Sequence, residues 1–314
     1  SSMATTLNAP QIQSDETLYS YIARCQWLWG ETSYKRTSID WFGRKGICLN
    51  QCLPCHIERI GYHSEYEVEY LLNNHTAFPL HFSFNSRSEK LKKSMCSSLV
   101  RNVANQSCSP QLSFGSYTQS RFCPKCVDED EANTGIAYWH LSHQIWGLCA
   151  CYKHGCRLEI HPFEARKYRL PFFAQEVSAV QSVKAEQVQA LFAQHVIKLL
   201  RVSVSLDKRR KYIRELFLTR GLLTPRMRIR MPFVLERVKN TCDELGLPNV
   251  LNARIIRRIV FAPELSIHPL KPLLLEFAVK GMSATSSPTI LLTPRPHKPY
   301  DEIAVRAKAL LESY

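Results

Sequence analysis

Apolar side chains recur every three or four residues over much of the chain, which is the spacing of one face of an α-helix. The first predicted helix begins after a cap at Ser14 or Asp15, ends at Gly30 and turns one stripe inward: Leu18, Tyr21, Ile22, Cys25, Leu28 and Trp29. The same period returns towards the other end and predicts helices from about residue 185 and over 207–220, 232–245, 252–260 and 269–279. The pattern therefore predicts a mainly α protein.

Shorter helices are predicted in the first third of the chain. One begins after Thr37, the next has Pro54 in its first turn, and a third opens with a capping box, Ser64–Glu67. An aromatic segment, His75–Phe84, is expected to be extended. Short helices with tight connections are typical of helix-turn-helix units, so we expect residues 14–104 to form a helix-turn-helix-like domain.

Composition divides the rest of the chain. A stretch rich in Ser, Gln and Gly before the cysteines is expected to be a linker, and a stretch rich in Ser, Thr and Pro is expected to precede a terminal helix. The first two residues resemble a cloning scar at the start of a disordered tail. The predicted organisation is a tail (1–13), the N-terminal helical domain (14–104), a linker (105–120), a zinc-binding module (121–165), a basic, helix-turn-helix-like helical domain (185–282) and a loop with a terminal helix (283–314).

Four residues of the kind that bind metals stand in two pairs. Two residues separate Cys123 from Cys126, and two separate Cys151 from His154. A pair at this spacing can bind one ion from a tight turn, and two pairs complete the tetrahedron that zinc prefers. Three thiolates and one imidazole leave no open position, so we predict one structural zinc ion in a knuckle or ribbon module. The ion would replace the apolar core that so short a segment lacks.

The choice of ligands in the second pair stays open, among Cys149, Cys151, His154 and Cys156. The spacing favours Cys151 with His154, although His140 and His143 also lie nearby in the sequence. Cys52 and Cys55 have no matching second pair, so we do not interpret them as a metal site. The acidic run 128–131 is expected in a loop and not in a metal-binding triad.

Positive charge is concentrated in one part of the chain. The whole sequence carries 41 Lys and Arg against 27 Asp and Glu, a formal net charge of +14, and residues 207–258 hold 14 bases and 5 acids, a local net charge of +9. Such clustering favours a nucleic-acid partner over the alternative of a basic face that only contacts solvent. The predicted contacts are Lys208, Arg209, Arg210, Lys211, Arg226, Arg228, Arg230, Arg254, Arg257 and Arg258.

Several functional classes lack their sequence signals. No run approaches the roughly 20 apolar residues of a membrane helix, and no secretion signal opens the chain. The 12 cysteines, without export signals, suit a reducing compartment, so we expect a cytoplasmic protein. No phosphate-binding loop, HExxH or GxSxG motif occurs, and we therefore predict that the chain is not an enzyme.

Five short motifs together resemble the TniQ/TnsD family, the target-selection proteins of bacterial cut-and-paste transposons. They are Asp15–Arg24 (DETLYSYIAR), His75–Leu80 (HTAFPL), Phe122–Cys126 (FCPKC), Tyr138–Trp139 and Cys151–Gly155 (CYKHG). Their order and spacing are specific, and they cover roughly residues 14 to 160. Tyr152 stands where the family often has a proline, and the second zinc ribbon of some relatives is not evident after Cys156.

The resemblance implies a non-enzymatic adaptor that marks an insertion site and recruits an AAA+ ATPase, which in turn engages the transposase at the bacterial nucleoid. In one branch of the family the adaptor recognises double-stranded attachment-site DNA directly, and the local charge favours this branch. In the other branch it joins an RNA-guided CRISPR Cascade complex, often as a homodimer, and the guide RNA selects the site. A zinc-containing DNA-binding transcription regulator is a further alternative.

Overall fold

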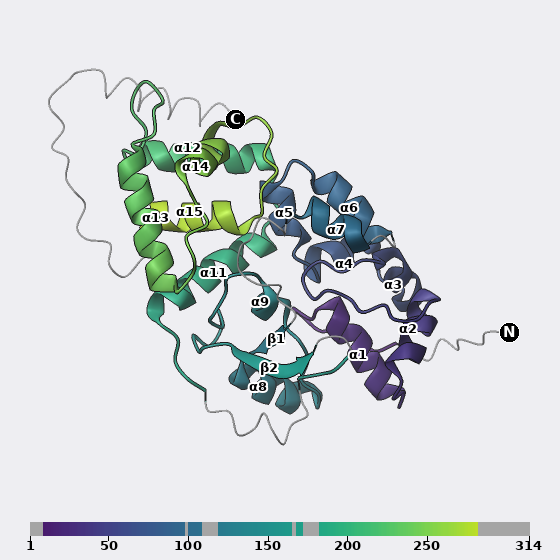
Figure 1. Cartoon of the computed structure of the whole chain (residues 1–314). Helices are drawn as coiled ribbons and strands as arrows, with labels where there is room; N and C mark the ends of the chain where they lie inside the picture. The colour runs from purple at the N-terminus through teal and green to yellow at the C-terminus, as the bar shows by residue number, and fades with distance from the viewer. Residues whose placement is uncertain (1–8, 98–99, 109–118, 165–167, 172–181, 282–314) are drawn as a thin grey trace. The chain divides into compact units, whose positions relative to one another are not determined.

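The computed structural model describes residues 9–97, 100–108, 119–164, 168–171 and 182–281 (Figure 1). The chain divides into two compact units, Ser1–Ala284 and Thr285–Tyr314, and all described residues belong to the first. Residues 1–8 of the predicted tail, 109–118 of the predicted linker and the predicted terminal loop and helix lie outside the described residues. Within the described residues the chain forms fourteen helices and one two-stranded sheet, so the prediction of a mainly α protein is confirmed.

Seven helices make up the N-terminal part of the described chain: α1 (Leu18–Leu28), α2 (Tyr34–Phe42), α3 (Ile57–Ser64), α4 (Val68–Asn74), α5 (Phe78–Phe84), α6 (Ser88–Cys96) and α7 (Val100–Gln106). The side chain of Thr17 caps α1 by accepting a hydrogen bond from the backbone N–H of Ser20 (3.1 Å). The first predicted helix therefore exists, but its cap is neither Ser14 nor Asp15. Asp15 instead accepts hydrogen bonds from the backbone and hydroxyl of Ser142.

Three predictions for this part are wrong. The second half of His75–Phe84 is not extended but forms α5, because Pro79 occupies the first helical turn, where no backbone N–H is needed, and most of the aromatic side chains are buried. The capping box does not form, since Ser64 is the last residue of α3 and its hydroxyl donates to the carbonyl of Ile60 (2.6 Å). Pro54 precedes α3 and does not lie within it.

The cysteine-rich module, residues 119–164, is built around a two-stranded antiparallel sheet. Its elements are β1 (Gln119–Phe122), α8 (Pro124–Thr134), α9 (Leu141–Gln144) and β2 (Glu159–Glu164). Arg121 of β1 stands opposite Ile160 of β2. The acidic run 128–131 lies in α8 and not in the predicted loop, because Pro124 starts the helix and Gly135 ends it in the left-handed region (φ 76°).

Five helices follow, close to where the apolar period predicts them: α11 (Gln187–Arg201), α12 (Leu206–Thr219), α13 (Met231–Leu245), α14 (Ala253–Phe261) and α15 (Leu270–Lys280). Asn252 caps α14 by accepting a hydrogen bond from the N–H of Ile255 (3.0 Å). Between α12 and α13, Leu223 and Ile229 form an antiparallel bridge, so the Arg-rich connection is a short hairpin. The helices are confirmed, whereas the helix-turn-helix likeness and the domain boundaries stay predictions.

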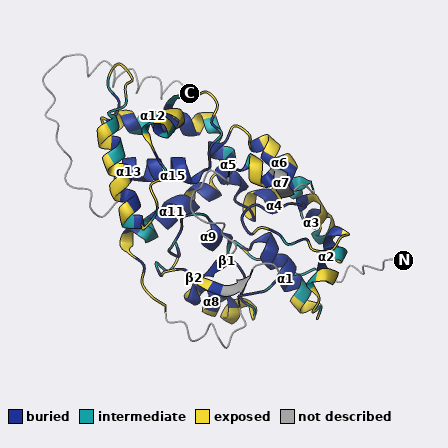
Figure 2. Ribbon diagram, viewed as in Figure 1, coloured by how far each residue is buried: buried dark blue, intermediate teal, exposed yellow. Residues whose placement is uncertain are grey.

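Buried residues from all three groups of elements form one apolar core (Figure 2). α15 is buried over almost its whole length, and one apolar cluster includes Leu18, Trp139 and Phe277 from three distant parts of the sequence. α1 behaves differently at its end, where Leu28 and Trp29 are 46% and 39% exposed although the sequence predicts both to point inward. None of the described helices has the length and hydropathy that a membrane span requires.

Candidate metal centre and basic surface

Cys123 and Cys126 lie at the junction of β1 and α8. Cys123 precedes the helix with an extended backbone, and Pro124 fits the first helical position, where a backbone N–H would have no partner. Cys126 therefore falls in the first turn of α8, and both thiols are buried. The two sulfur atoms lie 3.4 and 3.3 Å from Nδ1 of His154, so this strand-to-helix junction directs them to one point.

Cys151 and His154 lie in a tight turn on the other side of that point. Two backbone hydrogen bonds close the turn, from the N–H of Cys151 to the carbonyl of Cys156 (2.8 Å) and from the N–H of Gly155 to the carbonyl of Cys151 (2.9 Å). Gly155 adopts the left-handed region (φ 61°), which glycine enters without steric cost. The N–H of His154 faces the sulfur of Cys151 at 3.5 Å, a contact that favours a thiolate there.

The structure brings the four predicted metal ligands together. Their ligand atoms all lie within 4.8 Å of one another, and among the described residues this is the one cluster of its kind. Zn–S bonds of about 2.3 Å in a tetrahedron place two sulfurs about 3.8 Å apart. The sulfurs of Cys126 and Cys151 are 3.8 Å apart, and Nδ1 of His154 is 3.7 Å from the sulfur of Cys151. The cluster could therefore hold one metal ion with three sulfur ligands and one nitrogen ligand.

Further candidate donors border this cluster. The sulfur of Cys156 lies 3.0 Å from that of Cys123, which is closer than two thiolates on one tetrahedral zinc ion. His143 of α9 is buried, and its Nε2 lies 3.7 Å from the sulfur of Cys126. Cys149 is half-buried and outside the group of four. Of the alternatives that the sequence leaves open, the geometry favours the pair with the two-residue spacing.

The carboxylate of Glu129 contacts the His154 ring on the side that faces away from the cysteine sulfurs. Nε2 of His154 lies 2.9 Å from Oε1 of Glu129, which leaves Nδ1 facing the sulfurs. Lys153 also bonds this carboxylate, and Lys153 first and then His154 lower the pKa of Glu129. A carboxylate behind a ligating histidine fixes its tautomer and orientation. Glu129 is not among the site residues predicted from the sequence, although it stands three residues after Cys126 and thus on the same face of α8.

The structure divides the predicted nucleic-acid contacts into two classes. Arg209 and Arg210 are buried, with 6% and 9% exposed, so neither can meet a phosphate on the surface. Arg209 lies 3.5 Å from the carboxylate of Glu276, and Arg210 donates to the carbonyls of Ala262 and Pro263. These two predictions are corrected: both guanidinium groups connect α12 to the segments that follow it.

The remaining candidates face solvent wholly or in part. Arg254, Arg257 and Arg258 occupy the exposed side of α14, whereas Ile256 and Ile259 are buried on the opposite side. Lys208, Lys211, Arg226 and Arg228 are also exposed, and Arg230 is half-buried. The exposed cations therefore gather on α14, on the hairpin before α13 and at the start of α12. We call this set of residues the basic surface.

Comparison with known proteins gives two matches. Residues 7–158 match the family model TniQ. The chain is also 27% identical, over 259 residues, to the transposon Tn7 transposition protein TnsD of Escherichia coli, and the match covers 76% of this chain. Residues 7–158 are therefore a TniQ-family region, and the two matches together support the TniQ/TnsD family for this chain. The chain spans about half the length of that curated relative, of which the match covers 50%.

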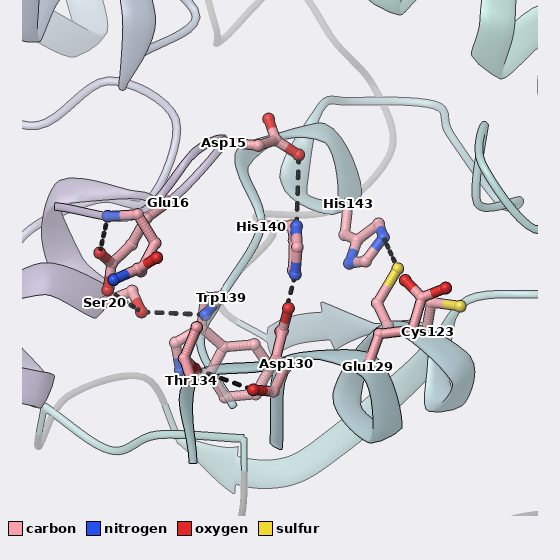
Figure 3. A network of polar contacts seen from close by, with 12 residues as sticks. Asp15, Glu16, Ser20, Cys123, Glu129, Asp130, Thr134, Trp139, His140 and His143 are labelled. Carbon is pink, nitrogen blue, oxygen red and sulfur yellow. Dashed lines mark hydrogen bonds and ion pairs between the residues drawn. The ribbon is translucent and has the colours of Figure 1, made fainter. Parts of the chain in front are cut away.

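A charged histidine between two carboxylates stabilises the TniQ region, by which we mean residues 7–158. Figure 3 shows His140 with Asp15 on one side and Asp130 on the other. Nδ1 of His140 lies 3.5 Å from the carboxylate of Asp15, and its Nε2 lies 2.8 Å from the carboxylate of Asp130. Burial opposes the charged imidazole, but the hydrogen bonds to Asp130 and Asp15 outweigh this effect and raise the pKa of His140 to about 9. The ion pair of Asp15 with His140 thus binds the chain segment before α1 to the cysteine-rich module.

A second polar contact in the TniQ region centres on Glu16, which is fully buried. Its carboxylate pairs with Arg24 at 2.8 Å and accepts a hydrogen bond from the hydroxyl of Ser20 (3.1 Å). Nδ1 of His75 lies 2.8 Å from the Glu16 carbonyl, and Ser20 accepts a hydrogen bond from the N–H of Trp139 (2.9 Å). Three of the family motifs therefore meet where α1 contacts the cysteine-rich module, and they maintain the fold there.

Proposed function

We propose that the cluster of Cys123, Cys126, Cys151 and His154 binds one structural zinc ion. Thiolate and imidazole ligands favour zinc over hard cations such as magnesium and calcium. The donor set would complete a tetrahedron and leave no site for a substrate, so the ion would stabilise the fold and not catalyse a reaction. Leu158 is the one apolar side chain grouped with the four buried sulfurs, which supports a need for metal at this place.

The basic surface supports duplex DNA as a ligand. Three arginines along one side of α14 match a helix that lies against the duplex, and the hairpin arginines add cations that can meet the phosphate backbone. Each cation that neutralises a phosphate releases a condensed counterion, which makes binding favourable at low salt. We infer that α14 and the hairpin before α13 form the DNA-contacting part of the chain.

The chain would then act as a non-enzymatic target selector of a bacterial transposon. Similarity to TnsD over 76% of this chain is the observation that carries this proposal. A selector of this kind binds attachment-site DNA and recruits the AAA+ ATPase regulator, through which the transposase reaches the chosen site. It would work in the bacterial cytoplasm, at the nucleoid.

Footprinting of the purified chain on candidate attachment DNA tests this function. We expect a protected segment with the chain alone, and an extension of the protection when the ATPase of the same transposon is added. Protection that requires a Cascade complex with guide RNA would replace direct recognition by the RNA-guided adaptor. Protection that the ATPase never alters would instead favour a transcription regulator.

A further inference from the structure

A short hairpin connects α12 to α13 (Figure 1), and its base and its tip lie in different surroundings. The N–H of Arg230 donates to the carbonyl of Leu222 (2.8 Å), and the N–H of Thr224 donates to the carbonyl of Arg228 (2.9 Å). Leu222 is buried, whereas residues 225–228 are all exposed. We call residues 225–228 the hairpin tip. The tip is therefore a small projection on a base that packs into the core.

One residue of the hairpin tip has a backbone conformation that its side chain disfavours. Met227 has a φ of 55°, in the left-handed region, and its N–H donates to the carbonyl of Thr224 (2.8 Å), which closes the turn. Three-residue hairpin loops favour glycine at this position, because a Cβ atom is crowded there. Met227 is 45% exposed and lies outside the apolar core of the described residues, so core packing does not require a methionine here.

Met227 also differs from the other residues with this conformation. Among the described non-glycine residues with a positive φ, it is the one exposed apolar residue. A residue that persists in a disfavoured conformation, where a common alternative would relieve it, indicates a function at that position. We therefore looked for a ligand that an exposed, unbranched apolar side chain at a narrow tip would contact.

The charge around Met227 indicates a polyanion. Arg226 and Arg228 flank it, and residues 216–235 contain four arginines and no Asp or Glu. Among the described residues, no carboxylate forms an ion pair with either flanking guanidinium group. The surface that complements the hairpin tip is therefore negatively charged on both sides of an apolar strip. The minor groove of DNA has this form, because sugar and base edges lie between two phosphate backbones.

We propose that the hairpin tip enters the minor groove of duplex DNA, with Met227 on the groove floor and Arg226 and Arg228 between the two phosphate backbones. This proposal rests on the proposed function and names the groove that the hairpin contacts. Proteins that bind the minor groove combine arginines, which its negative potential attracts, with apolar side chains such as methionine.

The size of the hairpin tip favours the minor groove over the major groove. The minor groove is about 6 Å wide, whereas an α-helix with its side chains is about 10–12 Å across. A helix such as α14 therefore fits only the major groove, and the hairpin is the part of the basic surface that is not helical. Readout in the major groove relies mainly on hydrogen bonds, which a methionine side chain forms poorly.

The first test measures the affinity of the zinc-loaded chain for attachment DNA after Met227→Gly. Binding should weaken by about 10-fold, because the variant loses the apolar contact and keeps both arginines. Its urea midpoint should stay close to that of the unaltered chain, since relief of the left-handed backbone offsets the greater freedom of glycine in the unfolded state. Met227→Leu keeps an apolar side chain and should bind about as tightly as the unaltered chain.

Two further variants control for the backbone. Met227→Asn repeats the test with a polar residue that tolerates the left-handed conformation, should the glycine variant unfold. Glu65→Gly is the matched control, because Glu65 is exposed and has a similar φ (62°) at the end of α3, outside the basic surface. Glu65→Gly should not weaken DNA binding.

Methylation by dimethyl sulfate identifies the groove. The reagent modifies N3 of adenine, which lies in the minor groove, and N7 of guanine, which lies in the major groove. The unaltered chain should protect adenine N3 positions that Met227→Gly leaves reactive. Protection of guanine N7 should be the same for both proteins.

Three results contradict the placement of the hairpin in the minor groove. In the first, Met227→Gly and Met227→Asn bind as tightly as the unaltered chain. In the second, the variants lose guanine N7 protection, which would place the tip in the major groove. In the third, the unaltered chain gives a footprint that includes no adenine N3 position. A chain that protects no DNA segment at all would instead contradict the proposed function itself.

Discussion

Different kinds of interaction stabilise the cysteine-rich module and the C-terminal helices α11 to α15. At the candidate metal centre the buried cluster consists of Leu158 and four cysteines, which are the three candidate ligands Cys123, Cys126 and Cys151 together with Cys156. The C-terminal helices instead bury large apolar side chains such as Phe192, Phe217 and Phe277. Order at the metal centre therefore depends on a few chemically specific groups, whereas order in the helices is distributed over many contacts.

The same contrast governs how each region relates to function. In the module, the residues that would bind the ion also hold the local fold, so structure and chemistry cannot be separated there. In the C-terminal helices one residue type serves two purposes, since Arg209 and Arg210 lie inside while Arg254 and Arg257 face solvent. Ligand spacing is thus a strong guide to function in the first region, and counting charges is a weak one in the second.

Removal of a metal ligand should have the largest effect, and it should affect the cysteine-rich module and not the C-terminal helices. Cys123→Ser and His154→Ala are expected to abolish zinc binding and unfold the module, because zinc contributes about 10–16 kcal/mol to the folding of small zinc-binding peptides. Metal analysis in reducing buffer should fall from about one zinc ion per chain to almost none. Hydrogen exchange should become fast over residues 119–164 and stay slow in α11 to α15.

Cys149→Ser is the matched control for these variants, because Cys149 lies in the same segment but outside the group of four. It should retain zinc and the slow exchange of the module. An unaltered chain purified without zinc would contradict the prediction outright. Zinc loss in Cys149→Ser but not in His154→Ala would instead assign a different fourth ligand.

The next largest effect is expected at the buried ion pair of α1. Arg24→Ala leaves the carboxylate of Glu16 buried without its cation, which should lower the free energy of unfolding by about 3–5 kcal/mol. Urea unfolding measures the change, and zinc content should not fall. Arg36→Ala is the control, because the pair of Arg36 with Asp40 is exposed and should contribute less than about 1 kcal/mol. Equal effects would show that the buried pair of Glu16 with Arg24 contributes no more to stability than the exposed pair.

The sequence predicts the C-terminal helices well and the N-terminal ones poorly, for a physical reason. The C-terminal helices have 9 to 15 residues, and each carries an apolar stripe that its neighbours bury, so the period alone locates α13 and α14 to within about a residue. The helices α3 to α5 have 7 or 8 residues each, and short-range signals such as Pro54, the Ser64–Glu67 box and the aromatic run compete there with tertiary packing. Packing prevails at all three places.

The candidate site shows the same division between local and distant information. Spacing predicts the metal ligands because each pair lies in a single tight turn, whereas the role of His140 depends on segments that meet only in the folded chain. Arg209 and Arg210 could have been recognised as internal. They stand one helical turn before Ile213, which in turn is four residues before the buried Phe217, so they continue an apolar stripe.

His140 gives a smaller effect, with a defined dependence on pH. Its pKa in the folded chain is raised from 6.5 to about 9, so its contribution to stability is complete below about pH 6.5 and is lost as the pH rises through about 9. His140→Gln should therefore lower the free energy of unfolding by at most about 3 kcal/mol at low pH, and the difference should vanish above about pH 9. Urea unfolding across this range measures it. His63→Gln is the control, because burial and then Arg59 lower the pKa of His63, which is the opposite direction to the shift of His140. A difference for His140→Gln that stays constant with pH would show that the charge on His140 does not stabilise the contact between the segment before α1 and the cysteine-rich module.

The smallest effects are expected from single arginine substitutions in the C-terminal helices. They should distinguish exposed arginines, which can contact DNA, from buried ones, which stabilise the fold. Arg228→Ala and Arg257→Ala each remove an exposed cation, so each should reduce the slope of log affinity against log salt by about one unit on attachment-site DNA. Arg209→Ala should leave that slope unchanged and lower stability instead, since it removes a partner of the buried Glu276. Fluorescence anisotropy at several salt concentrations measures the slopes, with Arg36→Ala as an exposed arginine outside the basic surface. A slope that falls equally for Arg209→Ala and Arg257→Ala would mean that burial does not decide which arginines meet DNA.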